Sequence, residues 1–339
     1  MKTHAIIPIF IPHLGCPNDC VFCNQKKITA KAKPLSGEEM TEMIGRYLKT
    51  ITGRGILTTE IAFYGGSFTG IPMDLQREYL SVAKQYKDKG LIQKIHLSTR
   101  PDYIDESILT NLKDFEVDII ELGVQSFDEE VLRLSNRGHN RKVVYTASRM
   151  IQDYGFELGL QLMIGLPGDT YEKSVASAQE AVKIKPSIAR LYPTVIIQDT
   201  VLYDLYQRGE YTPLSIEEAV RITKEMYLML TNAGINVIRV GLKSTDHISE
   251  SGDIAGGYHP AFRQLVEAEI AREQLEAQLQ PLLAHTAEIR FYSNGASFSN
   301  MIGNRKSNRI YFEKKYPHVR FTFHVDSKLT KDVYLALVL

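Results

Sequence analysis

Short apolar segments alternate with amphipathic segments through the first two thirds of the chain. Each apolar segment has the length of a buried strand, and the apolar residues of the segment that follows recur at helical spacing. This alternation favours right-handed βαβ units around a parallel sheet. The six predicted strands cover residues 5–11, 60–64, 94–100, 117–124, 157–165 and 187–193.

The same pattern assigns the chain to the α/β class, as a partial (β/α)6 parallel barrel with a small C-terminal α+β extension. We place the barrel in residues 1–245 and the extension in residues 246–339, and we expect the extension to cover the open edge or the mouth of the barrel. Helices are predicted at residues 36–49, 74–89, 104–113, 128–134, 142–154, 171–184, 202–207, 216–232 and 262–280, and further strands at 235–240, 289–292 and 319–325.

All three cysteines of the chain fall within eight residues, directly after the first predicted strand, in the spacing CxxxCxxC. An odd number of cysteines does not suit a disulfide framework, and a structural zinc site takes four ligands. Three thiolates that leave one coordination position open suit an iron–sulfur cluster. The loop with Cys16, Cys20 and Cys23 therefore predicts a metal centre at the carboxyl end of a strand, where parallel sheets bind their ligands.

Two other interpretations of the cysteines stay open at the level of the sequence. His13, three residues before Cys16, completes a tetrahedral zinc site if it joins the three thiolates. Alternatively, the thiols are buried without a metal, since Cys often packs as a small hydrophobic residue. The Gly, Pro, Asn and Asp residues around Cys16 favour the cluster, because turn formers let the chain wrap around an inorganic core.

The overall charge of the chain excludes a general attraction to nucleic acid or membranes, because 40 basic residues meet 40 acidic ones. No apolar run approaches the roughly 18 residues of a membrane span. The first residues also lack the small-residue cleavage site of a signal peptide. We therefore expect a cytoplasmic protein without a membrane partner, whose reducing surroundings keep the thiols available to a cluster.

Two local groups of basic residues suit contact with RNA. Basic side chains interleaved with aromatic ones combine phosphate contact with base stacking. A solvated charged face is the alternative, because the net charge of the chain is zero. The first group is Lys26, Lys27, Lys31 and Lys33, and the second is Arg305, Lys306, Arg309, Lys314 and Lys315, near Tyr311 and Phe312.

Several motifs carry a resemblance to a known family. CPNDCVFCN after the first predicted strand and GGSFTG after the second resemble the radical S-adenosylmethionine (SAM) superfamily, in which three cysteines hold a [4Fe–4S] cluster and SAM chelates the fourth iron. ELGVQSFD at 121–128, RGH at 137–139, LPG at 166–168 and YPT at 192–194 resemble the radical SAM domain of the Elongator catalytic subunit family, and more distantly oxygen-independent coproporphyrinogen III oxidase. The resemblance covers about residues 5–270.

The resemblance implies that the three cysteines hold the cluster and that residues at the ends of the strands bind SAM. It assigns Gly65, Gly66 and Ser67 to the amino group of the SAM methionine, and a glycine pair lets the backbone approach a ligand closely. It also places Gln125 and Arg137 beside SAM, where the planar fork of Arg suits a carboxylate. A plain turn for the glycines and a surface charge for Arg137 are the structural alternatives.

Two further positions follow from the resemblance. Met163 and Gly165 belong to the segment MIGLPG, which resembles an adenine-facing segment where apolar side chains and exposed backbone amides hold the base; a plain buried strand is the alternative for Met163. Ser98 opens the segment STRPD, where many relatives have an acidic residue in its place. Its hydroxyl can bond a ribose or amino group, but it supplies no charge.

The function that the resemblance implies is reductive cleavage of SAM at the cluster, which yields methionine and a 5′-deoxyadenosyl radical that abstracts hydrogen from a substrate. The Elongator relatives suggest tRNA as the substrate, and flavodoxin or ferredoxin is the expected class of electron donor. A porphyrinogen-like small molecule is the first alternative, and a non-catalytic metal-binding module is the second. The sequence assigns no catalytic side chain. The short tail shows no acetyl-CoA-binding Gly-rich turn, which argues against acetyl transfer by this chain alone.

Overall fold

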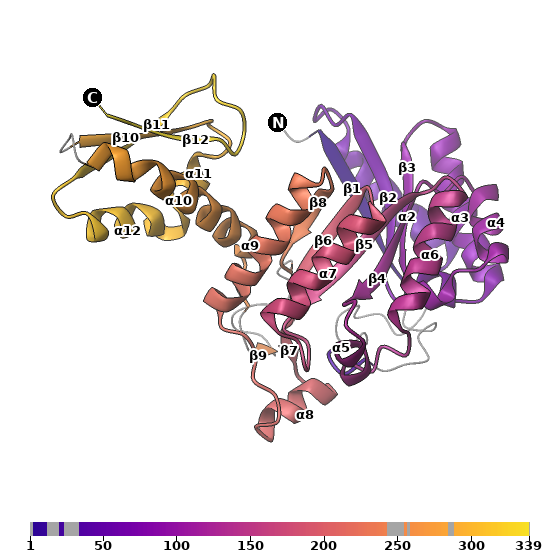
Figure 1. The fold of residues 1–339 in the computed structure, drawn as a ribbon. Helices are drawn as coiled ribbons and strands as arrows, with labels where there is room; N and C mark the ends of the chain where they lie inside the picture. The colour runs from indigo at the N-terminus through magenta and orange to yellow at the C-terminus, as the bar shows by residue number, and fades with distance from the viewer. Residues whose placement is uncertain are drawn as a thin grey trace.

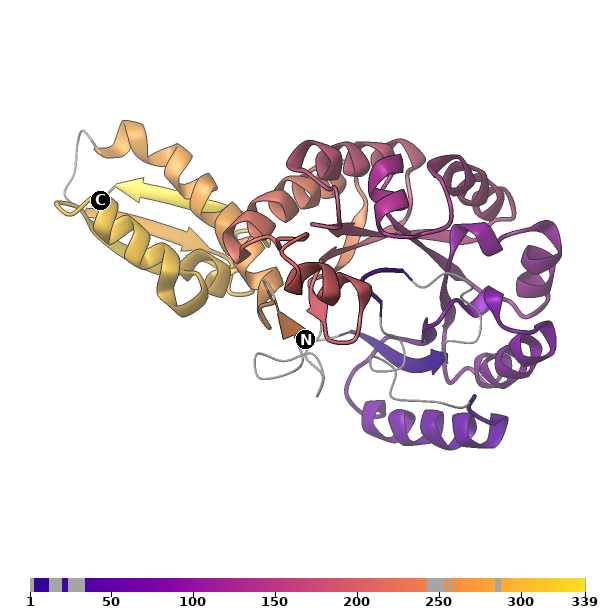
Figure 2. The ribbon, with the colours of Figure 1, turned by 90° about the horizontal axis from the view of Figure 1, so that it is seen from below.

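The computed structural model describes residues 3–11, 20–23, 34–242, 254–255, 258–283 and 288–338. Seven parallel strands form a sheet that curls into a partial barrel, with helices on its outer face (Figures 1 and 2). The strands stand in chain order, which confirms the predicted α/β fold, and the further strand predicted at 235–240 joins the six predicted units as the seventh strand of the sheet. They are β1 (His4–Ile11), β2 (Thr58–Gly65), β3 (Lys94–Thr99), β4 (Ile119–Gln125), β5 (Glu157–Ile164), β6 (Ile188–Pro193) and β8 (Asn236–Val240).

Most helices of the barrel begin at side-chain caps that the sequence provides, whereas the helix that starts at Met73 follows Pro72 without one. Ser36 and Glu39 form the predicted capping box, and Asp128 caps the helix that starts at Glu129. Among the described residues, no helix combines the length and apolarity that a membrane-spanning segment needs. The helices of the barrel are α2 (Gly37–Ile51), α3 (Met73–Asp88), α4 (Glu106–Asp114), α5 (Glu129–Leu134), α6 (Arg141–Asp153), α7 (Tyr171–Ile184), α8 (Val201–Gln207) and α9 (Ile216–Asn232).

The two faces of the curled sheet differ in polarity. Ile61 and Phe63 of β2 are fully buried in the apolar core that the sheet shares with the outer helices. Residues that alternate with them point to the other face, inside the barrel, and several of these are charged. Glu60, His96 and Glu121 are all buried there. Because buried charge is costly unless it is paired, the inside of the barrel is a candidate for function.

The carboxyl ends of the strands lie at the bottom of Figure 1, and Figure 2 looks onto this end. The short helices α5 and α8 lie there, together with the antiparallel pair of β7 (Ile196–Ile197) and β9 (Ile254–Ala255). Two 3-10 turns, Phe68–Gly70 and Pro101–Tyr103, follow β2 and β3. Two-residue strands are too short to produce a sequence pattern, which explains why β7 and β9 were not predicted.

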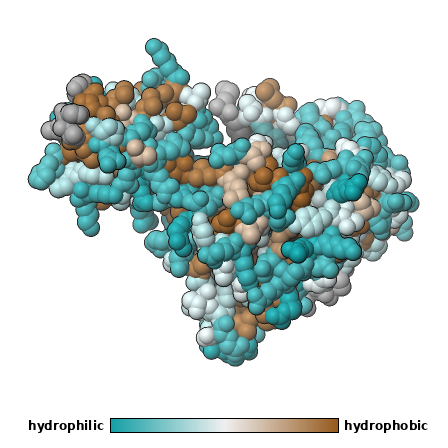
Figure 3. Space-filling model, viewed as in Figure 1, coloured by the Kyte–Doolittle hydropathy of each residue, from teal (hydrophilic) through white to brown (hydrophobic). Residues whose placement is uncertain are grey.

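The extension contains a three-stranded sheet in the order β11-β10-β12, with helices on one side of it (Figure 1). It packs through α10 against α9 and β8, so it covers the β8 edge of the barrel and not its mouth. Apolar side chains gather over this unit in Figure 3, and Val325 and Leu337 are among the exposed ones. Its elements are α10 (Phe262–Leu283), β10 (Glu288–Ser293), α11 (Phe298–Ile302), a 3-10 turn (Asn304–Lys306), α12 (Ser307–Lys315), β11 (Arg320–Val325) and β12 (Tyr334–Val338).

Two separate hydrophobic cores share the helix α10. Val266 and Ile270 belong to the core of the barrel, whereas Ala271 and Leu275 belong to the core of the extension. The change from one core to the other therefore falls inside a continuous helix. The division of the chain at residue 245 stays a prediction.

Candidate active site

Two of the three cysteines, Cys20 and Cys23, lie in the part of the chain that the structure describes, whereas Cys16 and His13 lie outside it. Cys20 is buried and Cys23 is half-buried. The N–H of Cys23 donates to the carbonyl of Cys20 over 2.9 Å, so the two cysteines share one tight turn. The alternative zinc site with His13 consequently stays a prediction of the sequence.

The residue between these cysteines anchors the turn at the carboxyl end of the barrel. The N–H of Val21 donates to the carbonyl of Ser135, just after α5, over 3.2 Å. The carbonyl of Val21 accepts from the N–H of Leu202, in the first turn of α8, over 2.8 Å. The cysteine segment is thus held between two short helices at the edge where parallel sheets bind ligands.

Arg137 joins the cysteine segment to the end of β4. One guanidinium nitrogen, Nη1, donates to the sulfur of Cys20 over 3.1 Å, and the other, Nη2, donates to the carbonyl of Gly123 over 2.5 Å. The residue is 5 % exposed, so the alternative of a surface charge is wrong. Its Nε atom is buried and has no hydrogen-bonding partner among the described residues.

The side chains of Gln125 and Arg137 both approach the backbone at Gly123. A Cβ atom at Gly123 would lie 3.1 Å from Nε2 of Gln125 and 3.5 Å from Nη2 of Arg137, so glycine leaves room for both. Gln125 has a φ of 69° and follows an irregularity in the register of β4. Positive φ in a non-glycine residue persists where its surroundings enforce it, and such residues gather at functional sites. The structure therefore brings together the Gln and Arg that the resemblance predicts.

The predicted glycine pair lies next to the start of the cysteine loop. Ile11, the last described residue before that loop, is the register partner of Gly65. The N–H of Gly66 donates to the carbonyl of Ile11 over 3.1 Å. Gly65 has a φ of 97°, which favours glycine, and Ser67 is buried. The turn after β2 is thus positioned as predicted, and its contact with SAM stays a prediction.

A second buried arginine lies against Arg137. Arg100 donates to the carbonyl of Arg137 and forms two parallel hydrogen bonds, of 2.9 and 2.8 Å, with the carboxylate of Asp102. Burial and the Arg137 guanidinium lower the pKa of His139 to about 4, so this ring is neutral at pH 7. Because Asp102 compensates Arg100 and the ring of His139 is neutral, Arg137 is the cation here that no carboxylate of the described residues compensates, and it favours an anionic ligand beside the cysteine segment.

Ser98 is already engaged by a neighbouring strand. Its hydroxyl donates to Oε1 of Glu121 over 3.1 Å, and Oε2 of Glu121 accepts from Nε of Arg190 over 2.6 Å. Glu121 is buried. Glu121 of β4 thus provides, next to Ser98 of β3, the carboxylate that many relatives carry in place of Ser98.

A network of buried charges continues across the inside of the barrel. His96 lies between two carboxylates, with Nδ1 3.4 Å from Oε1 of Glu60 and Nε2 3.6 Å from Oε2 of Glu121. Nη2 of Arg190 donates to the hydroxyl of Tyr64 over 2.5 Å, and the guanidinium lies 4.7 Å from the centre of that ring. Sequence reasoning missed this network. Its signal was the presence of charged residues in segments that are otherwise apolar.

The charges of the network hold each other in place. Burial raises the pKa of Glu121, but the charges of Arg190 and His96 outweigh this and lower it to about 2. Burial likewise raises the pKa of Glu60, but the hydrogen bond and charge of His96 outweigh burial, so the pKa of this carboxyl lies below its usual value. Burial lowers the pKa of His96, but Glu121 and Glu60 outweigh this and raise it above its usual value. The network therefore sets Arg190 and His96, whose protonated form it favours, against two carboxylates.

The geometry at the end of β5 agrees only in part with the predicted adenine segment. The N–H of Gly165 donates to Oδ2 of Asp169 over 2.8 Å, and its carbonyl accepts from the hydroxyl of Tyr211 over 2.6 Å. Both backbone groups are engaged within the chain, so the exposed amide expected at Gly165 is absent. A Cβ there would lie 2.8 Å from Cδ1 of Leu214, so packing requires the glycine. Met163 is half-buried at the end of β5 and stays a predicted contact.

The described residues fit a [4Fe–4S] cluster with bound SAM. The sulfur of Cys20 accepts a hydrogen bond from a buried cation, and such outer donors orient and tune metal-bound thiolates. The unpaired Nε of Arg137 and the positive φ of Gln125 lie at the same edge. Cys20 and Cys23, together with Cys16, would hold the cluster.

Two family models match the chain, the radical SAM superfamily at residues 10–181 and the radical SAM C-terminal domain at residues 186–272. The chain belongs to the radical SAM superfamily. It is a radical SAM enzyme, and its cofactors are those of the family, a [4Fe–4S] cluster and SAM. Such enzymes need a one-electron donor.

Sequence and structural relatives agree with this family. The chain is 29 % identical over 256 residues to a tRNA uridine(34) acetyltransferase of Methanocaldococcus infernus, which covers 64 % of this chain and 48 % of that protein. It is 27 % identical over 219 residues to the heme chaperone HemW of Bacillus subtilis, with 62 % and 55 % covered. The structure of M. infernus Elp3 superposes with a TM-score of 0.63 at 20 % identity, over 80 % of this chain and 64 % of that one. The chain thus spans about half the length of these two sequence relatives.

Proposed function

We propose that this chain is a radical SAM enzyme that modifies tRNA. The similarity to a tRNA uridine(34) acetyltransferase supports the choice of tRNA. The observation that carries the site is the bridge that Arg137 makes between Cys20 and Gly123, because it fixes the cysteine segment over the carboxyl end of β4. We further propose flavodoxin or ferredoxin as the electron donor, in the cytoplasm.

The residues of the chain bind and orient the cofactors, and the cofactors supply the reactive chemistry. When bound, the cluster supplies the electron that cleaves SAM to methionine and the 5′-deoxyadenosyl radical. Arg137, with its buried Nε, would bind the SAM carboxylate, and Gly65, Gly66 and Ser67 its amino group. Glu121 and Ser98 would face the ribose from inside the barrel.

Cleavage of SAM tests the assignment of the cysteines. The full chain is reconstituted anaerobically with iron and sulfide, reduced with dithionite and given SAM, and 5′-deoxyadenosine is measured by mass spectrometry. Cys20→Ala should lower its formation at least about 100-fold, because a cluster ligand is lost. Val21→Ala, in the same turn, is the matched control and should retain it. Full cleavage by Cys20→Ala would contradict the cluster assignment.

The substrate is tested separately. Mass spectrometry of tRNA nucleosides from cells with and without the gene should reveal one modified nucleoside that depends on it. Binding of purified tRNA should weaken steeply with salt, because phosphate contacts release counterions. Unchanged nucleosides together with no tRNA binding would overturn the tRNA proposal and leave the radical SAM assignment intact.

A porphyrin-type small molecule is the second candidate, favoured by the similarity to the heme chaperone HemW. The same reconstituted protein would then bind heme or consume a porphyrinogen, and tRNA would have no effect on SAM cleavage.

A further inference from the structure

The C-terminal unit places two helices and a tight loop between parallel strands. β10 leads into α11, the loop 303–306 and α12, and the chain then returns as β11, which pairs parallel to β10. β12 pairs antiparallel to the other edge of β10. The matching family models end at residues 181 and 272, so neither of them covers residues 273–338 or assigns that part a role.

A helix–loop–helix on a three-stranded sheet is the framework of KH modules, whose GxxG loop clamps the backbone of about four nucleotides of a single strand. We propose that residues 262–338 form a KH-like module that binds single-stranded RNA, with the loop 303–306 on the phosphates and the groove between α12 and β11 around the bases. The choice of RNA over DNA rests on the proposed function.

The loop 303–306 has the positive φ angles of a glycine-rich loop, although two of its residues are basic. Gly303 has φ 82° and ψ 159°, and a Cβ there would lie 2.3 Å from Oγ of Ser307 and 2.7 Å from the N atom of Asn308. Arg305 and Lys306 follow with φ values of 50° and 64°. Lys306 stands where the second glycine of GxxG belongs, and it keeps the left-handed conformation that glycine would adopt. The loop therefore presents two cations on a backbone that is bent as in a glycine loop.

The charge of the unit is complementary to a polyanion. Residues 262–338 contain eleven Lys or Arg and eight Asp or Glu, and the excess lies in residues 288–338, with nine against four, in a chain whose net charge is zero. Arg305 and Lys306 are exposed, and within the described parts of the chain no ion pair engages either of them. Two adjacent cations without acidic partners provide contacts for successive phosphates.

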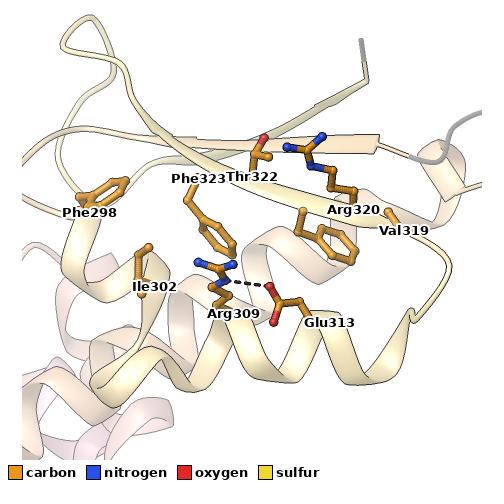
Figure 4. A pocket seen from close by; sticks show the side chains of 9 residues that line it. Phe298, Ile302, Arg309, Glu313, Val319, Arg320, Thr322 and Phe323 are labelled. Carbon is orange, nitrogen blue, oxygen red and sulfur yellow. Dashed lines mark hydrogen bonds and ion pairs between the residues drawn. The ribbon is translucent and has the colours of Figure 1, made fainter.

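A groove of about 380 Å³ continues from this loop (Figure 4). Ile302, directly before the loop, and Phe298 line it from α11, and Phe323 lines it from β11. Nε of Arg309 donates to Oε1 of Glu313 over 2.7 Å, which offsets the acidic side chain among the lining residues. Two Phe rings and an aliphatic side chain form a surface on which unpaired bases can stack.

The structure corrects which aromatic residues accompany this basic group. Phe312 is fully buried in the core of the unit, and the hydroxyl of Tyr311 donates to the carboxylate of Glu276 over 2.9 Å. The Arg272 guanidinium also lies 4.5 Å from the centre of the Tyr311 ring, so both aromatic residues predicted from the sequence are engaged within the unit. Phe298 and Phe323 take their place. The first basic group, at Lys26, Lys27, Lys31 and Lys33, lies outside the described residues.

Binding of short oligonucleotides to the full reconstituted chain tests the proposal. The probes are fluorescein-labelled octamers of random sequence, as single-stranded RNA, single-stranded DNA and RNA duplex, with an octaglutamate peptide for comparison. Fluorescence anisotropy gives Kd at several salt concentrations. We expect single-stranded RNA to bind tightest of the four.

Charge reversal in the loop gives the decisive variant. R305E/K306E should weaken RNA binding at least about tenfold and reduce the salt slope by about 1.4, the value for two lost phosphate contacts to a single strand. K328E/K331E is the control, because it reverses two exposed cations between β11 and β12, away from the loop 303–306. It should leave the Kd for RNA within about twofold, since phosphate contacts act over short distances. K306G removes one cation without disturbing the loop, so it should weaken binding while Tm is maintained.

Each other outcome overturns the proposal. These outcomes are no binding by the wild-type chain, equal losses in the loop and control variants, tighter binding of DNA or duplex, or equal binding of octaglutamate. The SAM cleavage assay keeps this test separate from the proposed function, because R305E/K306E should release 5′-deoxyadenosine at the wild-type rate. A chain that binds the octamer but neither binds tRNA nor changes a tRNA nucleoside would retain the module and lose the tRNA proposal.

Discussion

At the scale of single residues, His96 determines how the barrel tolerates charge in its interior. Its two ring nitrogens face Glu60 and Glu121, and the second of these carboxylates also accepts from Arg190. Removal of one partner from such a buried set leaves an uncompensated charge, which costs far more than an exposed ion pair contributes. The network therefore makes the stability of the barrel dependent on pH.

His96→Gln should be destabilised by about 3 kcal/mol at pH 6. The folded pKa of His96 lies above its unfolded value of about 6.5, so its stabilisation is complete below that pH and is lost as the pH rises through the folded pKa. The difference between wild type and variant should consequently narrow towards pH 9. Urea unfolding of both proteins at pH 6 and pH 9 measures this difference in the free energy of unfolding. His318→Gln, at an exposed position, is the control, and a difference that grows with pH would contradict the charged state of His96.

The residues of the candidate site differ in how far the sequence could predict them. Cys20, Gln125 and Arg137 belong to motifs, so their positions at or beyond the ends of β1 and β4 followed from the order of the strands. Glu121 and Arg190 could not be predicted as partners, because the pairing depends on which side chains the curled sheet brings together in its interior. The engaged backbone of Gly165 was also unpredictable, since Asp169 and Tyr211 reach it from separate loops.

At the scale of elements, the loop 303–306 determines whether α11 and α12 can pack as they do. Gly303 has backbone angles that side chains with a Cβ rarely adopt, and the chain turns there from one helix into the next. Asn308 completes the junction, because its Nδ2 donates to the carbonyls of Ala268 and Asn300 over 2.8 and 3.1 Å. The helix pair is thus fixed by one glycine and one buried amide.

Gly303→Ala should destabilise the C-terminal unit by about 2–3 kcal/mol, from backbone strain together with the clash at Ser307 and Asn308. Urea unfolding measures the change. Gly295→Ala is the matched control, because its Cβ would meet only Cγ1 of Val325 at 3.7 Å, an ordinary contact. Equal stability of the two variants would show that the loop is not strained.

Elements with a strong period were predicted well, and the short helices α5 and α8 were also predicted, whereas α11, α12 and β12 were not. The barrel strands and α9 followed from apolar runs and helical spacing. α11 has five residues, and α12 follows it after a tight turn, so the segment 298–315 showed no clear period. β12 lies at a sheet edge, where exposed residues interrupt the alternation.

At the scale of the whole molecule, α10 connects two cores that are otherwise separate. Its first half packs with the barrel and its second half with the C-terminal sheet. A continuous helix orients the two units, yet each unit buries its own apolar side chains. Local unfolding of one unit therefore need not unfold the other.

Leu275→Ala, in the second half of α10, should lower the stability of the C-terminal unit by about 3 kcal/mol, because it leaves a cavity at a fully buried position. Native-state hydrogen exchange should then accelerate about 100-fold for amides of β10–β12, since each 1.4 kcal/mol corresponds to a factor of ten, while β1–β6 keep their protection. Val266→Ala, on the same helix but in the barrel core, should give the reverse pattern. Equal acceleration in both units for both variants would mean that α10 makes them one cooperative body.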